Sequence, residues 1–201
     1  MLTVITPAPD EQRALLGLSD VKDELSISGD ADDGRLTRYL RSATARLAAY
    51  ANRDTFALEK VTETFRIPAY QPRIMLTRRP LVEVVAITLD GAPVEGWEAE
   101  GRFLYRVADG LRTCWTSGSW AVTYRAGYDL PGSAPADLAD ACMTLVKMQW
   151  FARTRDPLLK SQTVEGIGTD AWWIGGVSGS DGGRASLPPD MAAALYGYRF
   201  E

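Results

Sequence analysis

Histidine is missing from the 201-residue sequence. This absence removes the commonest general base, the most frequent metal ligand and the usual serine and cysteine triads. Cysteine is scarce, because Cys114 and Cys142 are the only two, and their spacing fits neither a redox pair nor a metal motif. We expect both to be buried free thiols. No apolar run approaches the roughly 18 residues that a membrane span requires.

Positive charge is also in short supply. The chain has 22 lysines and arginines against 26 acidic residues, a net charge of −4 and an isoelectric point of about 5.0. A protein whose main task was to grip duplex DNA would carry the opposite balance. The first residues, MLTVITPAPDEQRALLGLSD, lack the basic start and apolar core of a secretion signal, so we expect an intracellular origin.

Two segments carry the periodicity of amphipathic helices. Across residues 33–52, apolar side chains recur every three or four positions, at Leu36, Leu40, Ala43, Leu47 and Ala51. A second, wider apolar stripe runs from about 135 to 154, and Pro157 predicts its end. Ser19 is a plausible cap for a shorter helix through the letters SDVKDEL, and Ser133 for the second long helix. The sequence thus predicts two main helices with short ones beside them.

Between residues 60 and 125 the period changes to two. The letters VTETFRI, EVVAITL and SWAVTYRA alternate as strands do, and turn signals separate them. The Asp90-Gly91 pair predicts a tight hairpin. Pro68, Pro72 and Pro80 confine their segments to sheet edges or strand starts, because proline cannot donate to a ladder. This region is therefore predicted to be a small antiparallel sheet unit between the two main helices.

The letters YRAGYDLPGSAPADLADA join the last strand to the second long helix. Glycine and proline crowd this junction, which predicts a stiff hinge made by Gly127, Tyr128, Pro131 and Pro135. The sequence after the second helix is different, since it mixes glycine and serine with large aromatic residues. Such a segment cannot easily build its own core, so we expect its aromatic side chains to be buried against something outside it.

Several short patterns suggest chemistry but fail in detail. The acidic letters DADDG at 30–34 resemble the start of a calcium loop, yet Arg41 stands where a bidentate glutamate is required. A helix cap by Asp32 or Asp33 explains them better. The glycine-rich letters GIGTD and SGSDGGR lack the context of a phosphate loop. No catalytic residue, metal ligand or cofactor site is predicted.

The order and spacing of these parts resemble the head-tail adaptor, or connector, proteins of long-tailed bacteriophages and of phage-derived gene transfer agents. The residues that carry the resemblance lie between about 18 and 160. They are the strand end V-x-Y-x-A-G-Y, the proline-bearing junction, the helix start P-x-D-L-x-x-A and the closing R-D-P. The ending LPPDMAAALYGYRF resembles the C-termini of the gene-transfer-agent branch.

This resemblance implies a structural protein and not an enzyme. Such proteins usually form a ring of twelve copies beneath the portal protein and join it to head-completion or stopper proteins and then to the tail. DNA would meet the chain only in transit through the ring, and no membrane is involved. The chain would reside at the head-tail junction of a virion or gene-transfer-agent particle, and in the cytoplasm of the bacterial host during assembly.

The resemblance also assigns roles to residues. The junction would fix the sheet unit relative to a helical ring, with Tyr128 packed at the corner and no chemistry there. Five aromatic residues of the tail and one isoleucine would anchor the chain on the portal, since large buried aromatics dominate interface energetics. These predicted anchors are Trp172, Trp173, Ile174, Tyr196, Tyr198 and Phe200.

The expected fold is α+β, with two main amphipathic helices and short helices in a small bundle, an inserted antiparallel β subdomain and an extended C-terminal tail. The expected divisions are an N-terminal arm with helices at 1–57, the β subdomain at 58–128, a core helix at 129–157 that packs with 18–53, and a tail with a short terminal helix at 158–201.

Two other functions stay open on the sequence alone. A small β domain that binds carbohydrate or nucleic acid would use exposed tryptophans, and Trp97, Trp115 and Trp120 are the candidates. An enzyme based on carboxylates, such as Asp137 and Asp140 with Glu165, would show a dependence on metal.

Overall fold

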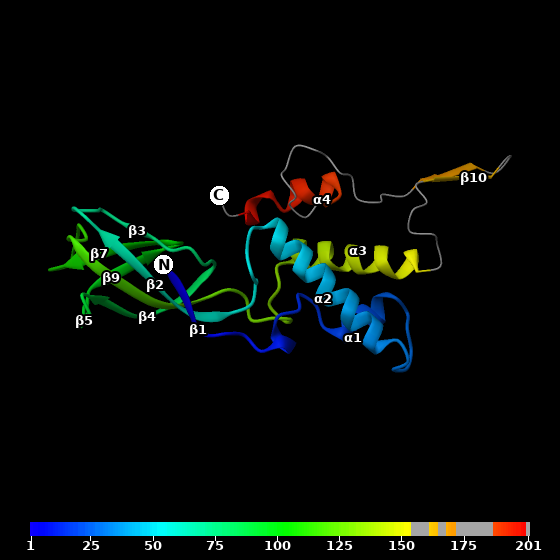
Figure 1. The fold of residues 1–201 in the computed structure, drawn as a ribbon, viewed down its shortest axis with the longest axis horizontal. Helices are drawn as coiled ribbons and strands as arrows, with labels where there is room; N and C mark the ends of the chain where they lie inside the picture. The colour runs from blue at the N-terminus through cyan, green and yellow to red at the C-terminus, as the bar shows by residue number, and fades with distance from the viewer. Residues whose placement is uncertain (154–160, 165–167, 172–186, 200–201) are drawn as a thin grey trace. The chain divides into compact units, whose positions relative to one another are not determined.

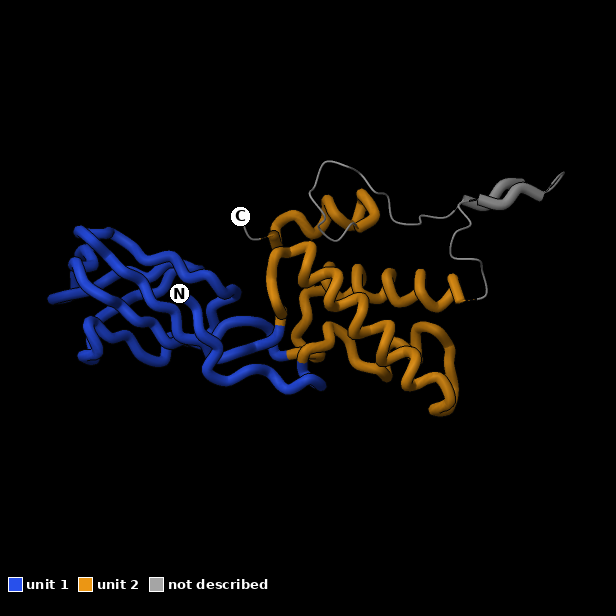
Figure 2. Tube along the Cα trace, viewed as in Figure 1, with its two compact units in different colours: residues 1–12, 57–129 blue, residues 13–56, 130–201 orange. Residues whose placement is uncertain are grey.

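The computed structural model describes residues 1–153, 161–164, 168–171 and 187–199 (Figure 1). The chain divides into two compact units (Figure 2): unit 1 comprises residues 1–12 and 57–129, and unit 2 comprises residues 13–56 and 130–201. Unit 1 consists mainly of antiparallel strands and unit 2 mainly of helices, which confirms the predicted α+β class. Residues 1–12, which the sequence grouped with the helices, belong to unit 1.

Two antiparallel sheets form unit 1. The larger has the order β1 (Leu2–Thr6), β2 (Glu59–Ile67), β9 (Gly118–Ala126), β4 (Leu81–Leu89) and β5 (Ala92–Pro93). The smaller has the order β3 (Ile74–Met75), β7 (Phe103–Ala108) and β6 (Trp97–Glu100), and β8 (Leu111–Thr113) pairs with β7. A short 3-10 helix, Asp10–Gln12, follows β1.

The core of unit 1 follows from the two-residue period of its long strands. In β9, Trp120, Val122, Tyr124 and Ala126 are all buried, and alternate residues of β2 face the same interior. Trp115 enters the same core and meets Trp120 edge to face, with ring centroids 4.8 Å apart. Each indole N–H donates to a backbone carbonyl, so the burial leaves no polar group of either ring unsatisfied.

The predicted hairpin at Asp90-Gly91 is confirmed. Both residues have positive φ, 49° and 87°, as a tight two-residue turn between antiparallel strands requires. Leu89 pairs with Ala92 across the turn, and Thr88 pairs with Pro93. Gly91 has no neighbour within 4 Å of an added Cβ, so its φ alone accounts for the glycine.

Unit 2 contains α1 (Leu18–Glu24), α2 (Asp33–Tyr50), α3 (Ala136–Ala152) and α4 (Pro189–Ala194), followed by a 3-10 turn at Tyr196–Tyr198. The hairpin of β10 (Ser161–Val164) and β11 (Gly168–Ala171) also belongs to it. α2 and α3 pack together through the apolar stripes that the sequence predicted, with Leu36, Leu40 and Leu47 buried on α2 and Leu138 and Leu145 on α3.

Three local predictions need correction. Gly17, not Ser19, caps α1, because the Asp20 carboxylate accepts the Gly17 N–H at 3.1 Å. Pro135, not Ser133, occupies the cap of α3. Cys114 is exposed, whereas the next residue, Trp115, is buried in the core of unit 1.

Cys142 is buried on α3, as predicted, and lies 3.8 Å from the Thr44 hydroxyl of α2. Burial raises the pKa of its thiol to about 11. The thiolate is therefore disfavoured at neutral pH, and Cys142 acts as a small apolar side chain in the α2–α3 contact.

Among the described helices, none has both the length and the apolarity that crossing a membrane would require.

Candidate functional site

Residues 187–199 of the C-terminal tail pack against the helices of unit 2. Leu187 and Leu195 are buried there. The Tyr50 hydroxyl donates to the carbonyl of Ala192 at 2.7 Å, which holds α4 close to the end of α2. Residues 187–199 therefore have a docking site within their own unit.

The predicted portal anchors divide into three groups. Tyr196 is 61% exposed, which leaves its ring available to a partner. The Tyr198 hydroxyl donates to Asp137 at 2.7 Å, and its ring meets Phe56 edge to face. Tyr198 thus has a role within unit 2 that the sequence did not anticipate. Trp172, Trp173, Ile174 and Phe200 lie outside the described residues. For all six, contact with the portal stays a prediction.

The predicted hinge residues fall on both sides of the boundary between the units. Gly127 and Tyr128 lie near the end of unit 1, whereas Pro131 and Pro135 belong to unit 2. Gly127 has φ +116°, and its N–H donates to the carbonyl of Pro80. The carbonyl of Tyr128 accepts the Leu58 N–H at 2.8 Å, which ties the end of unit 1 to the start of β2. Whether these residues fix the two units relative to each other stays a prediction.

A buried polar network in unit 1 was not predicted. Glu63 is 6% exposed and accepts hydrogen bonds from the Tyr124 hydroxyl at 2.9 Å, the Thr77 N–H at 2.9 Å and the Thr77 hydroxyl. The Tyr124 hydroxyl in turn accepts the Arg78 N–H at 3.1 Å. Burial, with the nearby Glu63 charge, raises the pKa of Tyr124 well above its usual value. This tyrosine stays a hydrogen-bond donor throughout the physiological pH range.

The network continues to the N-terminal arm. Glu59, also buried, accepts the Ala8 N–H at 3.3 Å and lies 3.8 Å from the Arg78 guanidinium. The two glutamates occupy inward positions of β2, where a two-residue period predicts apolar side chains. Their carboxylates connect β2 to the Thr77–Arg78 segment and to the arm after β1, so we assign the network to stability and not to catalysis.

We predict that Tyr124→Phe lowers the free energy of unfolding by about 1–3 kcal/mol, because Glu63 then keeps its burial and loses a donor. Urea denaturation measures the effect. The control is Tyr105→Phe, which removes a hydroxyl from a half-buried tyrosine of β7. Equal midpoints for the two variants would contradict the assignment.

The same variant carries a pH signature. The pKa of Tyr124 is raised in the folded state, so its contribution is complete below the unfolded pKa near 10 and is lost as pH rises above that value. Wild-type protein should therefore lose stability above pH 10 more steeply than Tyr124→Phe.

The residues proposed for other functions do not form a site. Trp115 and Trp120 are buried in the core, and Trp97 is half-buried, so the described surface offers no platform of exposed tryptophans. The Asp137 carboxylate accepts the Leu138 N–H and the Tyr198 hydroxyl, while Glu165 lies outside the described residues. Within the described ranges, no cluster of three acidic or cysteine side chains could hold a metal ion.

The structure contains a groove that the sequence did not predict. It lies beside β3 in unit 1, has a volume of about 310 Å³ and is lined by Phe65, Gln71, Arg73, Ile74, Met75 and Phe103. We call it the β3 groove. A signal was present in the sequence, because four arginines and no acidic residue stand between Glu63 and Glu83.

Solved structures with a similar fold include chains of gene transfer agent particles. The chain shares its fold with a chain in the neck of an empty gene transfer agent particle computed with C6 symmetry, at a TM-score of 0.55 and 19% identity, over 99% of this chain and 95% of that one. A chain in the virion of a native gene transfer agent particle gives a TM-score of 0.53 and 21% identity, over 99% and 95%.

A third solved structure, the neck of a native gene transfer agent particle computed with C12 symmetry, contains a chain that matches at a TM-score of 0.53 and 18% identity, over 99% of this chain and 94% of that one. No curated protein matches the sequence. The model of the family described as "Head completion protein" matches residues 14–171, which include most of unit 1 and the long helices of unit 2. The chain therefore belongs to the head completion protein family.

Proposed function

We propose that this protein is a structural head-tail adaptor. Copies of the chain form a ring beneath the portal, link the portal to head-completion and tail proteins, and leave a channel for DNA. The observation that carries the proposal is the family match across residues 14–171, together with a fold shared over 99% of the chain with chains of gene transfer agent necks. The C6 and C12 symmetries of those necks support a ring of twelve, since C6 is contained in C12.

The properties of the described residues support a structural role in which the protein acts by binding other proteins. The buried carboxylates of unit 1 are engaged by donors of the fold and face the interior. The net charge of −4 suits a conduit, because like charge discourages DNA from adhering to the wall. Carbohydrate or nucleic-acid binding through tryptophan lacks support, since Trp115 and Trp120 are core residues.

Native mass spectrometry of the purified chain, with and without its portal protein, tests the proposal. We expect portal-bound species that carry multiple copies of the chain, with twelve as the predicted number. A chain that stays monomeric and unbound with excess portal would contradict the adaptor function.

A further inference from the structure

The β3 groove combines a preformed apolar surface with positive charge. Two of its lining residues are tied to the unit 1 core, because Ile74 belongs to that core and Phe65 packs against it. Met75, which also lines the groove, is 50% exposed. Since the core holds Ile74 and Phe65 in place, the groove needs little ordering before a partner binds, which favours affinity.

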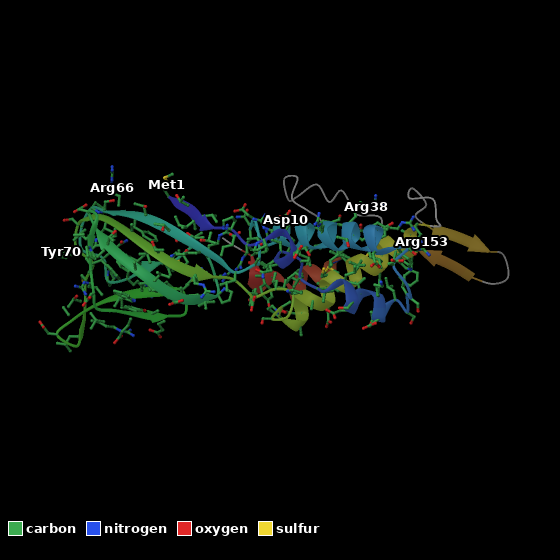
Figure 3. The ribbon with its side chains drawn as sticks, turned by 90° about the horizontal axis from the view of Figure 1, so that it is seen from below. Met1, Asp10, Arg38, Arg66, Tyr70 and Arg153 are labelled. Carbon is green, nitrogen blue, oxygen red and sulfur yellow. The ribbon has the colours of Figure 1, made fainter. Side chains whose placement is uncertain are left out.

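The aromatic ring of Phe103 holds two arginines beside the groove. The guanidinium carbon of Arg73 lies 4.3 Å from the ring centroid, and that of Arg102 lies 5.5 Å from it. Neither arginine forms an ion pair with a carboxylate in the part of the chain that the structure describes. Arg66, the neighbour of Phe65, also has no such partner there. It lies at the same end of unit 1 as Tyr70, which is 77% exposed (Figure 3).

Arg112 shows the contrasting arrangement on the same sheet. It also stacks on an aromatic ring, 4.0 Å from the centroid of Tyr105. Its guanidinium, however, already binds Glu98 at 2.8 Å and Glu100 at 3.3 Å. Arg73 in the β3 groove and Arg102 beside it have cation-π support from Phe103 but no carboxylate partner among the described residues, so an acidic group of a binding partner can pair with them.

We propose that the β3 groove binds an acidic protein segment with an apolar anchor residue. The apolar residue would enter the groove between Phe65 and Met75, and a carboxylate would pair with Arg73. Aromatic, methionine and arginine side chains are enriched in protein-protein interfaces, and the groove has all three. Nucleic acid would instead require a basic stripe along the surface. The volume of about 310 Å³ is at the lower end for ligand pockets and suits an anchoring side chain.

This inference names a second partner for the proposed adaptor and rests on that function. An adaptor needs a surface for the portal and another for the next protein toward the tail. The predicted portal anchors belong to the C-terminal tail, whereas the β3 groove belongs to unit 1. We therefore assign the groove to the tail-side partner.

Fluorescence anisotropy with the full chain tests the groove. The probe is a short labelled peptide in which glutamates flank a phenylalanine. The comparison probes are the same peptide with lysines for glutamates, the same peptide with alanine for phenylalanine, and a duplex DNA oligonucleotide. Wild-type protein and the control variant Arg112→Ala are expected to bind the acidic aromatic peptide equally. Arg73→Ala is expected to bind it about tenfold more weakly or worse, and all three comparison probes should bind wild-type protein more weakly than the acidic peptide.

Equal binding by Arg73→Ala and Arg112→Ala would overturn the inference, as would tighter binding of DNA than of the acidic peptide, or no saturable peptide binding. Native mass spectrometry with the portal is run on the same variants, and Arg73→Ala should assemble like wild type. A chain that binds the peptide through Arg73 but never joins the portal contradicts the adaptor function alone. A chain that joins the portal but binds the peptide without regard to Arg73 contradicts the groove alone.

Discussion

Gly127→Val is expected to unfold or severely destabilise unit 1, by about 3 kcal/mol or more. Gly127 has φ +116°, a conformation that side chains with a Cβ rarely adopt. A Cβ at this position would also stand 2.6 Å from the carbonyl carbon of Ala57 and closer still to its oxygen. The obstacle is backbone beside β2 and cannot rotate away. Urea denaturation followed by near-ultraviolet circular dichroism measures the loss.

Gly132→Val is the matched control. Gly132 lies five residues further along, has no atom within 4 Å of an added Cβ and is exposed. We expect the free energy of unfolding of Gly132→Val to stay within about 0.5 kcal/mol of the wild-type value. If Gly127→Val unfolded at the same urea concentration as Gly132→Val, the close approach of residue 127 to the Ala57 backbone would not contribute to the free energy of unfolding. If it also left ring assembly intact, the predicted hinge role of Gly127 would be wrong.

The second large effect concerns the portal. The triple variant Trp172→Ala, Trp173→Ala and Tyr196→Ala is expected to weaken portal binding at least about a hundredfold, since each buried aromatic hot spot contributes about 2 kcal/mol or more. Deleting residues 161–201 should have a similar effect on binding. The deletion, however, also removes Leu187 and Leu195, which are buried in unit 2, so the substitutions are the cleaner test. Surface plasmon resonance on immobilised portal gives the affinities.

Two tyrosine variants serve as controls for the tail. Tyr70→Ala removes an exposed tyrosine of unit 1 and should leave portal binding unchanged. Tyr198→Phe removes the hydrogen bond to Asp137 and should lower stability more than affinity. Undiminished binding by the triple variant would show that the tail does not anchor the chain on the portal.

Helices and strands could be predicted because their signal is local. The spacing of Leu36, Leu40 and Leu47 fixes which side of α2 meets α3, and the structure buries all three. The alternation in SWAVTYRA likewise gives the buried face of β9. The turn at Asp90-Gly91 could be predicted from these two adjacent residues alone. In each case a few neighbouring residues carry the information.

Features that depend on distant residues were not predictable. The sequence of residues 1–12 does not reveal that Leu2–Thr6 pairs with β2. Glu59 and Glu63 look like solvent-facing charges until Tyr124, Thr77 and Ala8 supply their donors. Cys114 was expected to be buried because cysteine commonly is. It follows the last residue of β8, however, and its exposure depends on where that strand ends in the fold.

The candidate sites show the same limit. The arginines between Glu63 and Glu83 are visible in the sequence, but the place of Arg73 in the β3 groove depends on β3 pairing with β7, which brings Arg73 to Phe103. The contact of Tyr198 with Asp137 joins residues 61 positions apart. The order of motifs, in contrast, was sufficient to indicate the head-tail adaptor resemblance that the family match supports.

Electron cryomicroscopy of the portal mixed with this chain tests the central claim most directly. We predict a closed ring of copies on one face of the portal, with twelve-fold symmetry and an open channel along the axis. Portal particles without added density, or with single copies bound at scattered positions, would contradict the claim that the chain works as a ring-forming adaptor.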